Sequence, residues 1–157
     1  MQEMLSEMIF PLLLEQPERY AYVTGSSEYP QICGMVLFYR FRKGTVVVAD
    51  ISGLPDNGSG MYGFHIHEGF ACAGNEEDPF AEAGAHFNPY RVEHPHHVGD
   101  LPVLMADHGR AWSAVYTERF LPGEVAGRTV IIHDMPDDFR AQPSGGSGVK
   151  IACGAIE

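Results

Sequence analysis

The sequence carries little positive charge. Its 157 residues include 10 lysines and arginines against 21 aspartates and glutamates, which gives a formal net charge of −11 at pH 7. Proteins that bind nucleic acids present a basic patch or stripe to the phosphates. The charge balance therefore argues against a nucleic-acid partner. It also leaves few cations with which to attract an anionic substrate.

Long apolar runs are also missing. No stretch approaches the roughly 20 apolar residues that a membrane helix needs, so we expect no membrane partner. A secretory signal begins with basic residues, continues with an apolar run and ends at a small-residue cleavage site. Residues 1–17 begin with acidic side chains and have no such site. We therefore expect no signal peptide, and a cytoplasmic location for the sequence as written.

Residues 1–17 are interpreted as an N-terminal extension to a single domain at residues 18–157, a size typical of one domain. Residues 1–8 would form a short amphipathic helix, while residues 9–14 are apolar but interrupted by Pro11. An extension of this kind would cover a sheet edge or a dimer contact.

Cysteine occurs only three times, as Cys33, Cys72 and Cys153. Cys33 lies in a run of strand-forming residues, QICGMV at 31–36. A free cysteine in such a run usually behaves as a small buried hydrophobe. We expect Cys33 to be a buried, inert thiol.

No long helical periodicity is present, and short runs rich in valine, isoleucine and aromatic residues alternate with glycine-rich turns. This pattern predicts an all-β fold, a sandwich or barrel of eight strands. The predicted strands are residues 20–24, 33–40, 45–51, 61–68, 101–106, 110–117, 129–133 and 150–156. Two long connections, residues 68–99 and 134–149, are expected to be functional loops, because long loops in compact domains usually carry function.

Six of the eight histidines lie in residues 63–100. His65 and His67 would point to the same face of a strand with their Cα atoms roughly 6.5 Å apart, close enough to converge on one ion. The remaining four, His86, His94, His96 and His97, lie with Asp100 in a segment broken by proline and glycine. A loop of this kind can fold three imidazoles and one carboxylate around zinc.

Five motifs follow one another in an order typical of one family. They are GFHIHE at 63–68, GAHFNP at 84–89, HVGDLP at 97–102, GRTVIIH at 127–133 and GVKIACG at 148–154. From Ile32 to Ile156 the sequence therefore resembles the copper/zinc superoxide dismutase family. The resemblance implies a Greek-key β-sandwich or barrel and a homodimer as a common assembly. It implies export if the sequence is a trimmed form of a bacterial protein.

The resemblance also implies a set of site residues. Copper would be held by His65, His67, His86 and His133. Zinc would be held by His86, His94, His97 and Asp100. Asp137 matches an aspartate that links a copper histidine to a zinc histidine, here His65 and His94. Cys72 and Cys153 would form a disulfide.

The sequence departs from the family pattern in two places. Only Pro95 and His96 separate His94 from His97, so His96 is an alternative zinc ligand to His94. Lys150 stands where the family has an arginine, which keeps the charge but loses the planar set of donors. Lys150 and Arg140 are our candidates for a positive funnel toward copper.

The implied reaction is the disproportionation of superoxide to dioxygen and hydrogen peroxide by copper redox cycling. Zinc would hold and polarise the shared imidazole. His86 would act as proton donor and Lys150 as the second catalytic residue. A first alternative is a non-enzymatic copper carrier or store on the same fold. A second is a jelly-roll mononuclear oxygenase, which needs a glutamate ligand, but Glu68 would face the other side of its strand.

Overall fold

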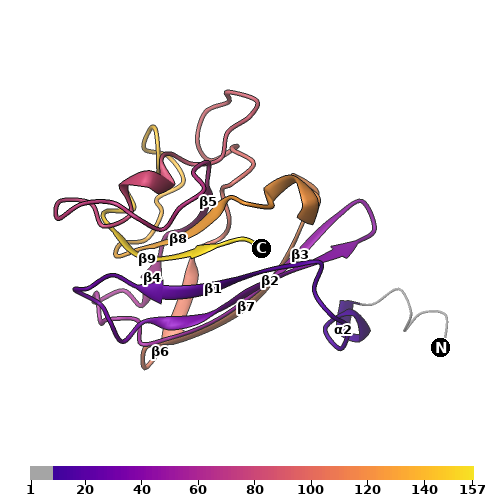
Figure 1. Cartoon of the computed structure of the whole chain (residues 1–157), viewed down its shortest axis with the longest axis horizontal. Helices are drawn as coiled ribbons and strands as arrows, with labels where there is room; N and C mark the ends of the chain where they lie inside the picture. Colours follow the sequence, from indigo (N-terminus) through magenta and orange to yellow (C-terminus); the bar gives the residue numbers. More distant parts are fainter. Residues whose placement is uncertain (1–8) are drawn as a thin grey trace.

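The structure is a computed structural model that describes residues 9–157. The helix predicted for residues 1–8 lies outside the described residues. The fold is almost entirely antiparallel β-structure (Figure 1). Its strands are β1 (Arg19–Gly25), β2 (Cys33–Phe41), β3 (Gly44–Ser52), β4 (Met61–Tyr62), β5 (Phe64–His67), β6 (Leu104–Asp107), β7 (Arg110–Thr117), β8 (Thr129–His133) and β9 (Lys150–Ala155). The helical segments are α2 (Ile9–Leu12) and the 3-10 turns η1 (Ala81–Ala83) and η2 (Pro122–Val125).

The all-β prediction is confirmed, with nine strands in the described residues instead of eight. The extra strand arises because the strand expected at residues 61–68 is divided at Gly63. Before this glycine the chain pairs with β6, and after it with β8. At the division itself, the Gly63 carbonyl accepts a 2.9 Å hydrogen bond from the His133 N–H.

The strand order shows how the sheet closes. Hydrogen-bonded neighbours follow the order β4-β6-β7-β3-β2-β1-β9-β8-β5. β4 and β5 therefore stand at opposite ends of the order, although only Gly63 separates them in the chain. The single sheet must curl until its two ends meet, which produces a nearly closed barrel.

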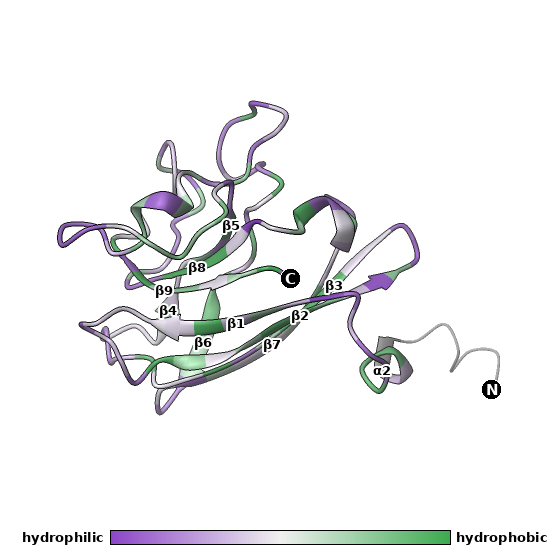
Figure 2. Cartoon of the chain, viewed as in Figure 1, coloured by the Kyte–Doolittle hydropathy of each residue, from purple (hydrophilic) through white to green (hydrophobic). Residues whose placement is uncertain are grey.

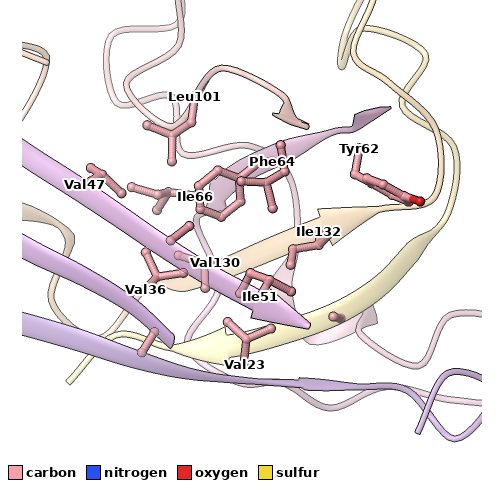
Figure 3. Packing of buried hydrophobic residues seen from close by; sticks show 14 of the residues in the cluster. Val23, Val36, Val47, Ile51, Tyr62, Phe64, Ile66, Leu101, Val130 and Ile132 are labelled. Carbon is pink, nitrogen blue, oxygen red and sulfur yellow. The ribbon is translucent and has the colours of Figure 1, made fainter. Parts of the chain in front are cut away.

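The barrel interior holds one continuous apolar core. Strand alternation turns every second residue inward, as with Val47 and Ile51 of β3 and Phe64 and Ile66 of β5. Figure 3 shows these side chains pointing toward one another between the strands. The opposite set of positions on β5 is His65 and His67, which the same alternation turns away from the core.

The part of the extension that the structure describes packs on the outer face of the sheet. Tyr39 of β2 and Val46 and Val48 of β3 are buried on the side away from the barrel core, where Leu12 and Leu13 lie against them. These two leucines cover a sheet face, whereas a sheet edge or a dimer contact was expected. Within residues 9–157, no helix is long and apolar enough to cross a membrane.

The prediction for Cys33 is wrong, because this free thiol is exposed. Strand alternation places Val36 and Phe38 of β2 toward the barrel core, so Cys33 belongs to the outward set of positions. Because β2 has apolar residues on both faces, the sequence around Cys33 does not show which side chains point toward the core.

The two long connections gather at one end of the barrel, above β5, β8 and β9 (Figure 1). They are largely hydrophilic, whereas the hydrophobic residues concentrate on the strands (Figure 2). The predicted Cys72–Cys153 disulfide is present and ties the first connection to β9, with a Cα–Cα distance of 5.6 Å. The barrel thereby presents both loops over the outward side of His65 and His67.

Candidate metal centre

The first connection runs back alongside β5 and buries its histidines. The Ile66 N–H donates to the Gly99 carbonyl at 2.8 Å, and the Phe87 N–H donates to the Ile66 carbonyl at 2.8 Å. These contacts bring His86 beside His67 and Asp100 beside His65. As a result His65 is 0% and His67 2% exposed, although both face away from the barrel core.

Four buried imidazoles form the first cluster. They are His65, His67, His86 and His133, and their possible ligand atoms all lie within 4.8 Å of one another. Each ring commits one nitrogen to a protein oxygen. His65 Nε2 lies 2.7 Å from Asp137 Oδ2, His67 Nδ1 2.8 Å from the Gly84 carbonyl, His86 Nδ1 2.8 Å from Asp100 Oδ1 and His133 Nδ1 3.3 Å from the Gly148 carbonyl. The other nitrogens face the cluster: His133 Nε2 and His67 Nε2 lie 3.4 Å apart, while His65 Nδ1 and His86 Nε2 have no hydrogen-bond partner.

The second cluster shares His86 with the first. It consists of His86, His94, His97 and Asp100, all buried and with ligand atoms within 4.8 Å. The Nδ1 atoms of the three rings lie 2.8, 3.1 and 3.2 Å from the Asp100 carboxylate oxygens. Ligands at 2.0–2.1 Å around a tetrahedral zinc lie roughly 3.3 Å apart, so this spacing suits that ion.

Buried imidazole nitrogens without a hydrogen-bond partner show whether the two clusters suit metal ions. His65 Nδ1, His86 Nε2, His94 Nδ1 and His97 Nδ1 are buried without a hydrogen-bond partner. The nitrogens of His94 and His97 approach Asp100 closely but are not aligned with it as hydrogen bonds. Buried polar atoms are almost always paired, and the exceptions need an explanation. Nitrogen lone pairs that converge on a common point fit copper in the first cluster and zinc in the second.

Burial favours the neutral form of His65, His67 and His133, which is the form that binds a metal. It lowers the pKa of His133 to about 3, with a further contribution from the neighbouring His65. Burial also lowers the pKa of His67 well below its ordinary value, and that of His65 despite the opposing hydrogen bond to Asp137.

Asp137 joins the two clusters, as the resemblance implies. One oxygen accepts from His65 Nε2 at 2.7 Å and the other from His94 Nε2 at 2.9 Å. Burial by itself would raise the pKa of this carboxyl, but the hydrogen bonds from His65, the Phe139 N–H and His94 hold it at about 2. Asp137 therefore stays charged and fixes the orientation of both rings.

Three further residues support the site and were not found from the sequence. Arg119 donates to the carbonyls of His97 and Asp100 at 3.0 and 3.1 Å. Gln142 exchanges two hydrogen bonds with the His94 backbone, at 2.7 and 3.0 Å. Gly145 has a φ of +71°, and a Cβ there would lie 2.0 Å from Asp137 Oδ1.

A pocket of about 790 Å³ leads to the first cluster and is lined in part by His67, His86 and His133. Lys150 lies in its wall. Arg140, the other cation expected in a funnel, is exposed and is not among the lining residues. The cation of the pocket that sequence reasoning missed is Arg91.

A sequence profile described as "Copper/zinc superoxide dismutase (SODC)" matches residues 32–156. The chain belongs to the copper/zinc superoxide dismutase family. A relative from Deinococcus radiodurans named "Superoxide dismutase [Cu-Zn]" is 32% identical over 145 residues, which cover 81% of this chain and 78% of the relative. A relative of the same name from Photobacterium leiognathi is 34% identical over 118 residues, which cover 66% and 68%.

The solved structure of "Cu/Zn superoxide dismutase from Brucella abortus" has the same fold, with a TM-score of 0.77 and 28% sequence identity. The match covers 89% of this chain and all of that one. The activity is therefore the one expected, superoxide disproportionation, and the cofactors of this superoxide dismutase are copper and zinc.

The comparisons do not favour a non-enzymatic copper carrier or store, since the matched relatives are named as dismutases. The oxygenase alternative lacks its ligand, because Glu68 is exposed and belongs to neither cluster. Between the two candidate zinc ligands, the structure brings His94 into the second cluster and leaves His96 exposed.

Proposed function

We propose that the first cluster is the copper site and the second the zinc site of this dismutase, with His86 shared between them. The observation that carries the assignment is that each cluster holds two buried imidazole nitrogens without a hydrogen-bond partner, those of His65 and His86 in the first and of His94 and His97 in the second. Copper, when bound, supplies the one-electron redox chemistry, and zinc supplies positive charge without redox activity. The copper ligands are His65, His67, His86 and His133, and the zinc ligands are His86, His94, His97 and Asp100.

His86 is the residue best placed to move a proton. Its Nε2 is buried in the first cluster without a hydrogen-bond partner, while Asp100 holds its Nδ1 at 2.8 Å. Superoxide leaves as hydrogen peroxide only after it takes up one electron and two protons, so a proton donor beside the reacting anion assists the reaction. The 790 Å³ pocket gives a small anion access to this ring.

Single ligand replacements test the assignment. We expect His133→Gln to lose copper and keep zinc, and His94→Gln to lose zinc and keep copper. Copper content is read by electron paramagnetic resonance and zinc content by mass spectrometry. His108→Gln is the matched control, because His108 is 95% exposed and belongs to neither cluster, so both metals should remain. Loss of zinc but not copper in His133→Gln would show that the first cluster binds zinc and would reverse the assignment.

We further propose that residues 18–157 are the catalytic domain and residues 1–17 an extension to it. The contact of Leu12 and Leu13 with the outer sheet face supports this division, because it lies away from both clusters. A chain that begins at residue 18 should bind both metals. The homodimer, the cytoplasmic or exported location, and the absence of nucleic-acid and membrane partners stay predictions. Light scattering tests the dimer and cell fractionation tests the location.

A further inference from the structure

Lys150 is a cation that lies beside a proposed copper ligand in the fold. It opens β9 and is the cross-strand partner of His133 on β8. Its side chain is only 15% exposed and lies in the wall of the pocket. The ammonium does not point freely at the approaching substrate, because it donates to Asp78 Oδ2 at 2.7 Å and to the Phe80 carbonyl at 3.1 Å.

Asp78 is itself held in place by the loop that carries it. Its Oδ1 accepts the Phe80 N–H at 3.0 Å, which leaves Oδ2 for Lys150. Burial alone would raise the pKa of this carboxyl, but the hydrogen bonds from Lys150 and the Phe80 N–H lower it. Asp78 is therefore an anion at neutral pH, and the charge of the ammonium beside His133 is compensated at short range.

The rest of the pocket lining carries more negative than positive charge. Its lining includes four carboxylates and two cations. The carboxylates are Glu68, Glu77, Asp78 and Glu93, and the cations are Arg91 and Lys150. The whole chain has a net charge of −11. Superoxide is an anion, and a negative field around a cleft lowers the rate at which anions arrive.

We propose that Asp78 is a positioning residue of this dismutase, which holds the Lys150 ammonium against the pocket wall and cancels its attraction for small anions. The inference rests on the proposed copper site. Sequence spacing cannot reveal it, since Asp78 and Lys150 are 72 residues apart.

The test compares the copper- and zinc-loaded full chain with Asp78→Asn and with Asp107→Asn. Asp107 is 94% exposed, lies at the end of β6 and does not line the pocket, so the control removes the same charge elsewhere. Two quantities are measured against ionic strength: kcat/KM for superoxide by pulse radiolysis, and the Kd of azide at copper by absorbance. Azide is the probe for a small monovalent anion, and metal content is measured on every sample.

Asp78→Asn should raise kcat/KM about two- to fivefold at low ionic strength and tighten azide binding by a similar factor. Its rate should fall with salt more steeply than that of the wild type, because salt screens the uncovered ammonium. Asp107→Asn should follow the wild type. In Asp78→Asn combined with Lys150→Gln the gain should disappear, which would show that Asp78 acts through Lys150.

An unchanged or weaker azide affinity in fully loaded Asp78→Asn would overturn the inference while leaving the copper assignment intact. A gain that survives in the double variant would also overturn it, since Asp78 would then repel anions directly. A wild-type Kd for azide that rises with salt as steeply as that of Asp78→Asn would show that Asp78 does not compensate the ammonium, and would contradict the proposal. Absence of copper from the wild type would remove the proposed function and the inference together.

Discussion

His65 and Asp137 form a fully buried pair, with Nε2 of the ring 2.7 Å from Oδ2 of the carboxylate. The second oxygen of the same carboxylate lies 2.9 Å from Nε2 of His94. One side chain from the second loop thus sets the ring orientation of a proposed copper ligand and a proposed zinc ligand. The two sites are joined twice, once through the shared His86 and once through Asp137.

Replacement of Asp137 should therefore weaken metal binding without removing a ligand. We expect Asp137→Asn to lower zinc affinity about 10- to 100-fold, a loss typical of the partners that orient metal-binding histidines. Competition with a chromogenic chelator measures the affinity. Asp138→Asn is the matched control, since Asp138 accepts only the backbone N–H groups of Arg140 and Ala141 in the described hydrogen bonds. Equal zinc affinity in the two variants would contradict this role.

Gly145 should be intolerant of any side chain because of its contact with Asp137. An added Cβ would lie 2.0 Å from Asp137 Oδ1 and 2.7 Å from His94 Nε2. Gly145→Ala should lower the free energy of unfolding by about 1–3 kcal/mol more than Gly146→Ala, as overpacking does in well-filled sites. Gly146 also has a positive φ, of +61°, but its Cβ would meet nothing closer than 3.8 Å. Denaturant unfolding compares the pair, and equal losses would leave only backbone strain as the cause.

The disulfide should contribute strongly to stability. Cys72 and Cys153 are 81 residues apart, and closing a loop of that length stabilises the fold by about 4 kcal/mol in the chain-entropy model. Cys72→Ser should lose most of this free energy of unfolding in urea. Cys33→Ser, which removes an exposed free thiol, should lose almost none. Equal stability of the two variants would show that the bridge adds nothing.

Metal removal should make the protein sensitive to acid. In the metal-free fold, burial holds the pKa of His133 at about 3, below its ordinary value of 6.5. Between these values the unfolded chain binds more protons than the folded one, so the stability present above pH 6.5 is lost as the pH falls. From pH 7.5 to 5.0 this one histidine should cost about 2 kcal/mol of unfolding free energy. If the free energy of unfolding of the metal-free protein does not change with pH, the lowered pKa of His133 is contradicted as the cause.

The sequence predicted the strands well, because short β-branched runs and glycine turns are local signals. It could not show that Gly63 divides a strand, since the change of partner from β6 to β8 depends on barrel closure. Nor could it show the direction of Cys33, because β2 is apolar on both faces. These features are set by contacts between strands and not by the residues alone.

The histidine pair of β5 was predictable from its spacing, and the remaining site residues came from the family motifs. The choice between His94 and His96 was open, because both lie in one short loop and only folding decides which ring is buried. Arg119 and Gln142 donate hydrogen bonds to backbone carbonyls of the site. Every residue has a backbone carbonyl, so no residue type in the sequence marks such a contact. The Lys150–Asp78 contact was hidden for a similar reason, as it joins β9 to a distant loop.

The most direct test of the two linked metal sites is metal content measured together with superoxide removal on the full chain loaded with copper and zinc. The two clusters predict about one equivalent of each metal and superoxide removal that stops when copper alone is withdrawn. Full copper occupancy without superoxide removal would contradict the account, and so would a chain that binds only one metal ion in total.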